Sequence, residues 1–144
     1  GLTDQEDGEA NTQKMRESGI AANIPILEYC KDGWYLPARN EMEAVFNAYN
    51  GGPSQSSGLK PDAIKQEEKD ARAAWDKILT DNGGDVMNVK ADNTAGDSYF
   101  TSTEADDASK VFYVRFGQWN PGLTGAKYAK SPARYVRCIR KISK

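Results

Sequence analysis

The chain has 144 residues, enough for one domain with a hydrophobic core, and its 19 basic and 21 acidic residues leave a formal charge of -2. This near balance argues against nucleic acid as a partner, because phosphate binding requires clustered basic side chains. No apolar run approaches the ~18 residues that a membrane span needs, and no histidine is present to act as a general base or metal ligand.

Four helices are predicted in the first part of the chain, at residues 11–18, 24–31, 39–49 and 61–81. Glycine-containing runs follow all four and act as stop signals. The third helix carries an apolar stripe at i, i+3, i+4 and i+7, formed by Met42, Val45, Phe46 and Tyr49. The fourth is expected to bury an apolar stripe of its own, formed by Ile64, Ala71, Trp75, Ile78 and Leu79.

Extended segments are predicted on both sides of the fourth helix. Pro37 disfavours a helical conformation at Leu36, so residues 34–37 are expected to be extended. Strands are predicted at residues 98–102, 110–116 and 134–142. Residues 85–97 and 117–125 are rich in turn-forming residues and are expected to form loops and turns. Helices before strands indicate an α+β fold, with several helices packed on a small antiparallel sheet.

Four short motifs occur in a fixed order along the chain. They read Asp-Gly-Glu-Ala-Asn-Thr at residues 7–12, Gly-Trp-Tyr-Leu-Pro at 33–37, Tyr-Phe-Thr-Ser-Thr-Glu at 99–104 and Tyr-Val-Arg-Cys-Ile-Arg at 135–140. Together they resemble the C-terminal domain of Legionella collagen-like protein, a family related to the Fibrobacter succinogenes major paralogous domain. The resemblance implies a C-type-lectin-like fold over a single domain, residues 1–144, and a surface protein of the Bacteroidetes type.

Two positions depart from the pattern of that family. Ala38 replaces the usual Ser and removes the N-cap hydroxyl of the third helix, a change that typically costs about 1 kcal/mol. Glu41 remains as half of a capping box. Phe100 and Thr101 replace the usual Trp and Ser, which is a conservative change for a packed strand.

The motif residues are interpreted as scaffold. Large apolar side chains are expected to fill the seam between helices and sheet: Trp34, Leu36 and Phe100. Short polar side chains are expected to bind neighbouring backbone in a loop after a strand: Ser102, Thr103 and Glu104. A catalytic role for Glu104 is the alternative, but no second acid, histidine or nucleophile accompanies it in a motif.

No enzyme activity and no cofactor are expected. Formylglycine-generating enzymes share the broad fold implied by the resemblance, but their reactive cysteines have no counterpart arrangement in Cys30 and Cys138. A calcium-dependent lectin site is also disfavoured, because Trp119-Asn120-Pro121 lacks the final carboxylate of the lectin triplet. Four aspartates remain as an alternative calcium set, although solvated loop acids are favoured: Asp81, Asp85, Asp92 and Asp97.

The resemblance further implies a disulfide between Cys30 and Cys138, which would join the helical region to the last strand. Two buried free thiols are the alternative, because free cysteine packs well as a small apolar group. The resemblance also implies a ligand surface on the C-terminal strands and their loops, at Trp119, Asn120, Tyr128 and Arg134. The alternative is that the Trp119 ring packs against the core or against an upstream segment of the protein.

The leading function is an extracellular binding or adhesion module that recognises a glycan or a protein. A structural or assembly domain of a pilus or larger surface protein is the alternative. The expected location is extracellular or at the cell surface, associated with the outer membrane or a pilus, with no membrane insertion by this segment. Gly1 is interpreted as a remnant of tag removal, so the natural protein is expected to extend upstream. The resemblance implies that the domain is the later part of a longer secreted protein, because a strand-rich segment often precedes the first motif in the family.

Overall fold

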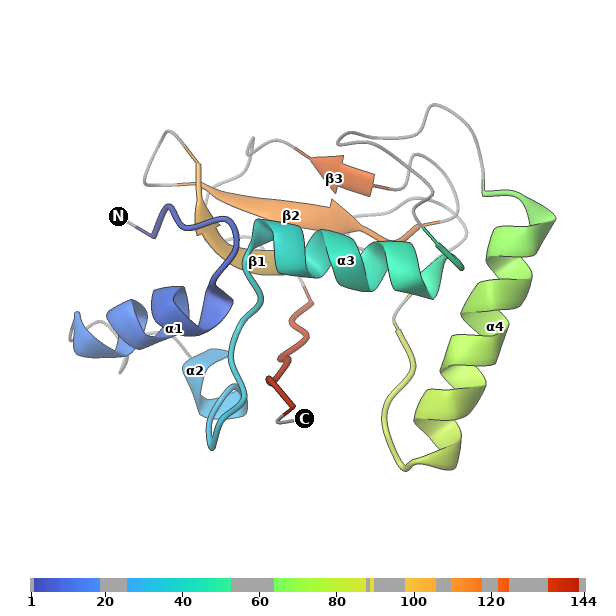
Figure 1. The fold of residues 1–144 in the computed structure, drawn as a ribbon, viewed down its shortest axis with the longest axis horizontal. Helices are drawn as coiled ribbons and strands as arrows, with labels where there is room; N and C mark the ends of the chain where they lie inside the picture. Colours follow the sequence, from blue (N-terminus) through green and yellow to red (C-terminus); the bar gives the residue numbers. More distant parts are fainter. Residues whose placement is uncertain are drawn as a thin grey trace.

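A computed structural model describes residues 2–18, 26–52, 64–87, 89, 98–105, 110–117, 122–124 and 135–142. In these ranges the chain forms four helices and a three-stranded antiparallel sheet (Figure 1). The helices are α1 (Gly8–Glu17), α2 (Ile26–Tyr29), α3 (Arg39–Tyr49) and α4 (Gln66–Asp81), and the strands are β1 (Ser98–Glu104), β2 (Val111–Arg115) and β3 (Gly122–Thr124). The prediction of an α+β fold is therefore confirmed. No helix in the described ranges is long and apolar enough to span a membrane.

The sheet has the strand order β1-β2-β3, and both pairings are antiparallel. Residues 135–142 extend this layer on the other side of β1. Tyr135 forms a parallel bridge to Tyr99, and Ile139 forms an antiparallel bridge to Tyr35. Two strand predictions are thereby corrected. The described part of the predicted strand at 134–142 makes two isolated bridges, and β3 lies inside residues 117–125, which were predicted as a turn.

The helix predictions were correct in type and less accurate at the boundaries. The prediction of α3 at residues 39–49 is confirmed. Helix α1 begins three residues earlier than predicted, because Oδ1 of Asp7 accepts a hydrogen bond from the Ala10 N–H and caps the helix. Helix α2 ends at Tyr29, two residues before the predicted end. Helix α4 begins at Gln66, and Ile64 and Lys65 before it are not helical.

A hydrophobic core lies between α3 and the sheet, and Figure 1 shows α3 crossing in front of β1 and β2. We call it the first core; its buried members are Met42, Phe46, Tyr49, Met87, Tyr99, Val114 and Phe116. The ring of Phe116 lies at its centre, with centroid distances of 5.2 Å to Phe46 and 5.1 Å to Tyr99. The predicted stripe of α3 is thus buried as expected, except that Val45 is only partly buried.

A second core lies at the other end of the molecule, where α1 and α2 pack against residues 135–142. Its buried members are Met15, Leu27, Cys30 and Leu36. Cys30 and Cys138 form a disulfide there, with 5.4 Å between their Cα atoms and a sequence separation of 108. The structure therefore contains the pairing that the resemblance implied.

Two predictions of burial were wrong. On α4, Trp75 is 39% exposed and Ile78 is 53% exposed, whereas Glu68 and Arg72 are buried. Trp34 is also exposed, because it follows a turn at the surface of the second core. Of the other residues expected in the seam, Leu36 is buried and Phe100 is partly buried.

Candidate functional site

The residues predicted to bind a ligand lie outside the described residues. They are Trp119, Asn120, Tyr128 and Arg134. Asp92 and Asp97 of the alternative calcium set also lie outside the described residues. Its other two members, Asp81 and Asp85, are exposed. No group of three or more potential metal-ligating side chains occurs in the ranges that the structure describes.

The first motif, residues 7–12, lies at the start of α1. Its polar side chains form a hydrogen-bonded cluster with the second and third motifs, which we call the polar hub. The buried side chain of Asn11 donates hydrogen bonds from Nδ2 to the Asp4 carbonyl at 2.8 Å and to Oγ of Ser102 at 3.3 Å. Oγ1 of Thr12, also buried, accepts a hydrogen bond from the Leu36 N–H at 3.1 Å. The first motif therefore holds the second and third motifs in place.

The third motif completes this hub from within β1, and not from a loop after a strand as predicted. Oγ1 of Thr103 accepts a hydrogen bond from the Arg39 N–H at 3.0 Å and donates one to the Asp4 carbonyl at 2.7 Å. The Thr103 hydroxyl thus binds an N–H in the first turn of α3, where Ala38 offers no hydroxyl. Oε2 of Glu104 accepts a hydrogen bond from the Leu2 N–H at 2.9 Å.

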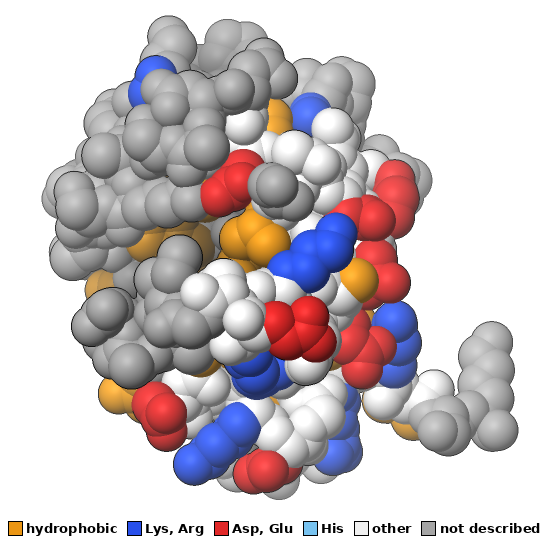
Figure 2. Space-filling view, turned by 90° about the vertical axis from the view of Figure 1, so that its left-hand side faces the viewer, with side chains coloured by type: hydrophobic (Ala, Val, Ile, Leu, Met, Phe, Trp, Pro, Cys, Tyr) orange, Lys and Arg blue, Asp and Glu red, His pale blue; other side chains and the backbone are white. Residues whose placement is uncertain are grey.

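Charged side chains surround the hub at the surface. Figure 2 shows basic and acidic side chains interspersed on the side of the molecule that carries α1. Nζ of Lys141 lies 2.9 Å from Oε2 of Glu9 and 3.8 Å from Oδ1 of Asp7. The hydrogen bond to Glu9 raises the pKa of Lys141. Nearby, burial and the charge and hydrogen bond of Glu41 raise the pKa of Tyr35 to about 12.

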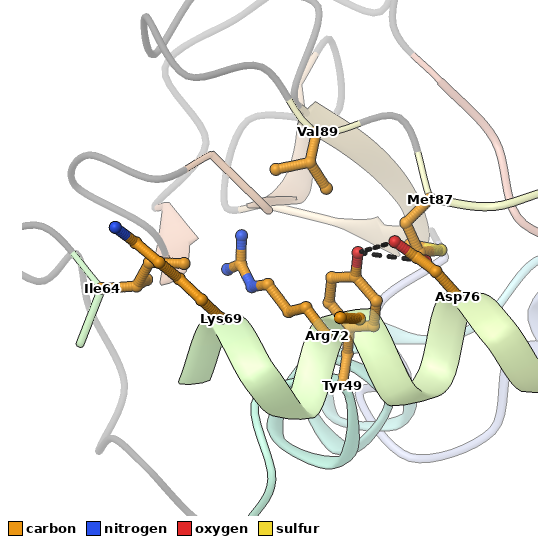
Figure 3. Close-up of a pocket in the computed structure, with 8 residues that line it drawn as sticks. Tyr49, Ile64, Lys69, Arg72, Asp76, Met87 and Val89 are labelled. Carbon is orange, nitrogen blue, oxygen red and sulfur yellow. Dashed lines mark hydrogen bonds between the residues drawn. The ribbon is translucent and has the colours of Figure 1, made fainter. Parts of the chain in front are cut away.

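A pocket opens beside α4, at the edge of the first core (Figure 3). It has a volume of about 280 Å³ and is lined by Tyr49, Ile64, Lys69, Arg72, Ala73, Asp76, Met87 and Val89. None of these residues was predicted to form a site. Except for Ile64, they lie outside the apolar stripe that was predicted for the fourth helix. The i, i+4, i+8 spacing of Glu68, Arg72 and Asp76 places these three residues on one face of the helix, and this spacing is the sequence signal for a second, charged face of α4.

Arg72 lines the back of the pocket, and hydrogen bonds hold its guanidinium in place. Its Nε donates a hydrogen bond to Oδ1 of Asn50 at 2.8 Å, and its Nη1 donates one to the Phe116 carbonyl at 2.6 Å. The guanidinium also lies 5.2 Å from the centre of the Tyr49 ring. Arg72 therefore joins α4 to the end of α3 and to the end of β2.

The two ends of the pocket differ in charge. In Figure 3 the charged groups of Lys69 and Arg72 point toward the same end, and Asp76 lies at the other end beside Met87. The Tyr49 hydroxyl donates to the Asp76 carboxylate, with its oxygen 3.1 Å from Oδ2. Burial raises the pKa of Tyr49, and the Asp76 charge raises it further, so this hydroxyl stays a donor at neutral pH.

No family model, curated protein or solved structure matches the chain. The pocket combines apolar side chains with three charged groups, which belong to Lys69, Arg72 and Asp76.

Proposed function

We propose that this chain is a non-enzymatic binding module of a bacterial cell-surface protein, with a C-type-lectin-like fold, which recognises a glycan or a protein. The observation that supports this most strongly is the use of the motif side chains. Asn11, Thr12, Thr103 and Glu104 all make hydrogen bonds that hold distant backbone segments together. Because these side chains hold the fold together, we expect other residues, at the surface, to bind the ligand.

The disulfide supports a location outside the cytoplasm. Structural disulfides persist in oxidising compartments and are rare where thiols are kept reduced. The bond between Cys30 and Cys138 joins the region after α2 to the last described segment, as the resemblance implies. We therefore place the module at the cell surface or outside the cell, in association with the outer membrane or a pilus.

The contacts of Glu104 support a structural role for this residue. Oε2 of Glu104 already accepts from the Leu2 N–H, and the Glu104 N–H donates to the Leu2 carbonyl at 2.7 Å. This two-way contact fixes the first described residues to the end of β1.

A structural or assembly domain is the second candidate. Three large apolar side chains favour it, because they are exposed on or just after α4: Trp75, Ile78 and Val86. A surface patch of such side chains, where they lie together, is typical of a face that another part of an assembly covers. A domain of this kind would show no ligand of its own.

The two candidates are separated by a binding screen. The purified, oxidised chain is applied to a glycan array and to a panel of extracellular proteins. Saturable binding to a small set of related ligands is the outcome expected for a binding module. Absence of binding, together with self-association in analytical ultracentrifugation, would favour the assembly domain.

A further inference from the structure

We propose that the pocket beside α4 binds a ring-sized molecule that carries one carboxylate, with the carboxylate at the Lys69 end. This inference rests on the proposed function, because it names the ligand class and the site of the binding module. It is carried by three features of the pocket: its positive end, its apolar walls and its small floor residue.

The positive end is formed by Lys69 and Arg72. Lys69 lies on the exposed rim, and it forms no ion pair within the part of the chain that the structure describes. Arg72 is only 5% exposed and is held by oxygens from α3 and β2, so its position at the back of the pocket is fixed before any ligand binds. A carboxylate that bound here would make charge-assisted hydrogen bonds with the Lys69 ammonium group.

The acidic side chain that lines the pocket lies far from the Lys69 end. Asp76 is the one acid among the eight described lining residues, and it lies seven residues after Lys69 on the same helix. Seven residues of α-helix correspond to a rise of about 10 Å. Asp76 accepts a hydrogen bond from the Tyr49 hydroxyl at the far end, and its distance from Lys69 limits its repulsion of a ligand carboxylate bound at the Lys69 end.

The walls suit the body of a single ring. Ile64 and Met87 are buried side chains, and Val89 and the Tyr49 ring complete an apolar surface opposite α4. The volume of about 280 Å³ is just below the range of roughly 300–1,000 Å³ for drug-sized sites. A monosaccharide or a comparably small ring therefore fits the space better than a longer ligand.

Ala73 keeps the centre of the pocket open. It lies between Lys69 and Asp76 on the face of α4 that lines the pocket, and its methyl group is the smallest side chain there. The next residue, Ala74, is also exposed but does not line the pocket. These two alanines provide a matched pair of substitutions, one that fills the pocket and one that does not.

The carboxylate can come from an acidic sugar or from a non-sugar ring acid, and the experiment separates these sources. Glucuronate and cyclohexanecarboxylate are titrated into the ¹⁵N-labelled chain, with glucose and cyclohexanemethanol as neutral counterparts. Saturable NMR shifts of pocket residues with either acid, and weaker or no shifts with its neutral counterpart, support the proposal. The acid that binds more tightly identifies the source.

Variants test whether binding occurs at this pocket. Ala73→Phe should abolish the shifts, whereas Ala74→Phe should leave the affinity unchanged. Lys69→Gln should weaken binding by about tenfold, the loss expected for one charge-assisted contact. Lys77→Gln, a second exposed lysine of α4, should have no effect. Thermal unfolding of each variant shows whether the fold is retained, and Lys69→Gln serves as the decisive variant if Ala73→Phe does not fold.

Several outcomes would overturn the proposal. These are no saturable shift with either acid, equal binding of the neutral counterparts, or unchanged affinity in both Ala73→Phe and Lys69→Gln. Repeating the ligand screen with Ala73→Phe separates this inference from the proposed function. Ligand binding that persists in that variant would reject the pocket and leave the binding module standing. No binding in the ligand screen, together with a saturable acid titration, would reject the binding module and leave the pocket standing.

Discussion

The backbone N–H of Gly8 donates a hydrogen bond of 3.0 Å to Oε2 of Glu41. The same oxygen accepts a hydrogen bond from the Ala38 N–H at 2.8 Å. A Cβ atom at residue 8 would lie 2.4 Å from the Leu36 carbonyl oxygen and 2.5 Å from that Glu41 oxygen. Helix α1 can therefore meet the start of α3 at this point only because residue 8 has no side chain.

Gly8→Ala is expected to destabilise the protein strongly. The new methyl group would overlap backbone atoms that cannot move independently, so the cost should exceed about 3 kcal/mol, the upper end of common single substitutions. Gly84→Ala is the matched control, because its nearest contact would be 3.3 Å and its backbone is not left-handed. Urea unfolding of both variants measures the difference. A loss at Gly8 no larger than that at Gly84 would contradict the close approach.

The stability of the protein should fall between pH 10 and pH 12 through Tyr35. Its folded pKa is raised from 10.0 to about 12, so the folded state holds the hydroxyl proton more tightly than the unfolded state does. The resulting stabilisation is complete below the unfolded pKa and is lost as the pH rises through the folded pKa. Tyr35→Phe should reduce the alkaline loss of stability, measured by urea unfolding from pH 8 to pH 12. The part due to Tyr49, whose pKa is also raised, should remain.

Reduction of the disulfide should lower the melting temperature. The bond closes a loop of 108 residues, and the chain-entropy model assigns up to about 4.7 kcal/mol to a loop of this size. A double variant, Cys30→Ala with Cys138→Ala, should melt at one temperature with or without reductant. Alkylation of the unfolded, unreduced protein provides a direct check. Uptake of two labels in the mass spectrum would show two free thiols and contradict the bond.

Arg72 should contribute more to stability than Trp75, although both are on α4. Arg72→Met removes hydrogen bonds to Asn50 and to the Phe116 carbonyl and leaves these buried oxygens without that donor, at a cost of about 2–4 kcal/mol. Trp75 is 39% exposed, so Trp75→Ala should cost less than about 2 kcal/mol. Thermal unfolding of the two variants gives the order. The reverse order would mean that α4 packs through its apolar stripe.

The contrast between α3 and α4 shows which parts of the fold could be predicted from the sequence. In α3 the apolar stripe and the buried face coincide, so periodicity located the helix and its core residues. In α4 the stripe residues Trp75 and Ile78 are exposed, and the buried Arg72 is held by the Phe116 carbonyl, 44 residues away in sequence. Local periodicity contains no information about such a distant acceptor.

The same limit applies to the motifs and to the pocket. Residues 7–12 and 99–104 were recognised as motifs in the sequence, but no local pattern indicated that Thr103 would accept a hydrogen bond from the Arg39 N–H beside Ala38. The short strand β3 was predicted as a turn because Gly122 and its neighbours favour turns, and only pairing with β2 makes it a strand. The pocket combines residues from α3, α4 and the segment after α4, and their proximity follows from the tertiary fold.

The central claim is that this chain recognises a ligand, and the most direct measurement is saturable binding by the isolated, oxidised protein. The panel of glycans and extracellular proteins is probed over a range of chain concentrations. The reduced, alkylated and heat-unfolded chain serves as a control for non-specific adhesion, and Trp119→Ala tests the predicted loop surface. We expect saturable binding to a small set of chemically related ligands, which soluble ligand competes and which the unfolded chain does not show. No saturable binding across the panel, or equal signals from the folded and unfolded chains, would contradict ligand recognition.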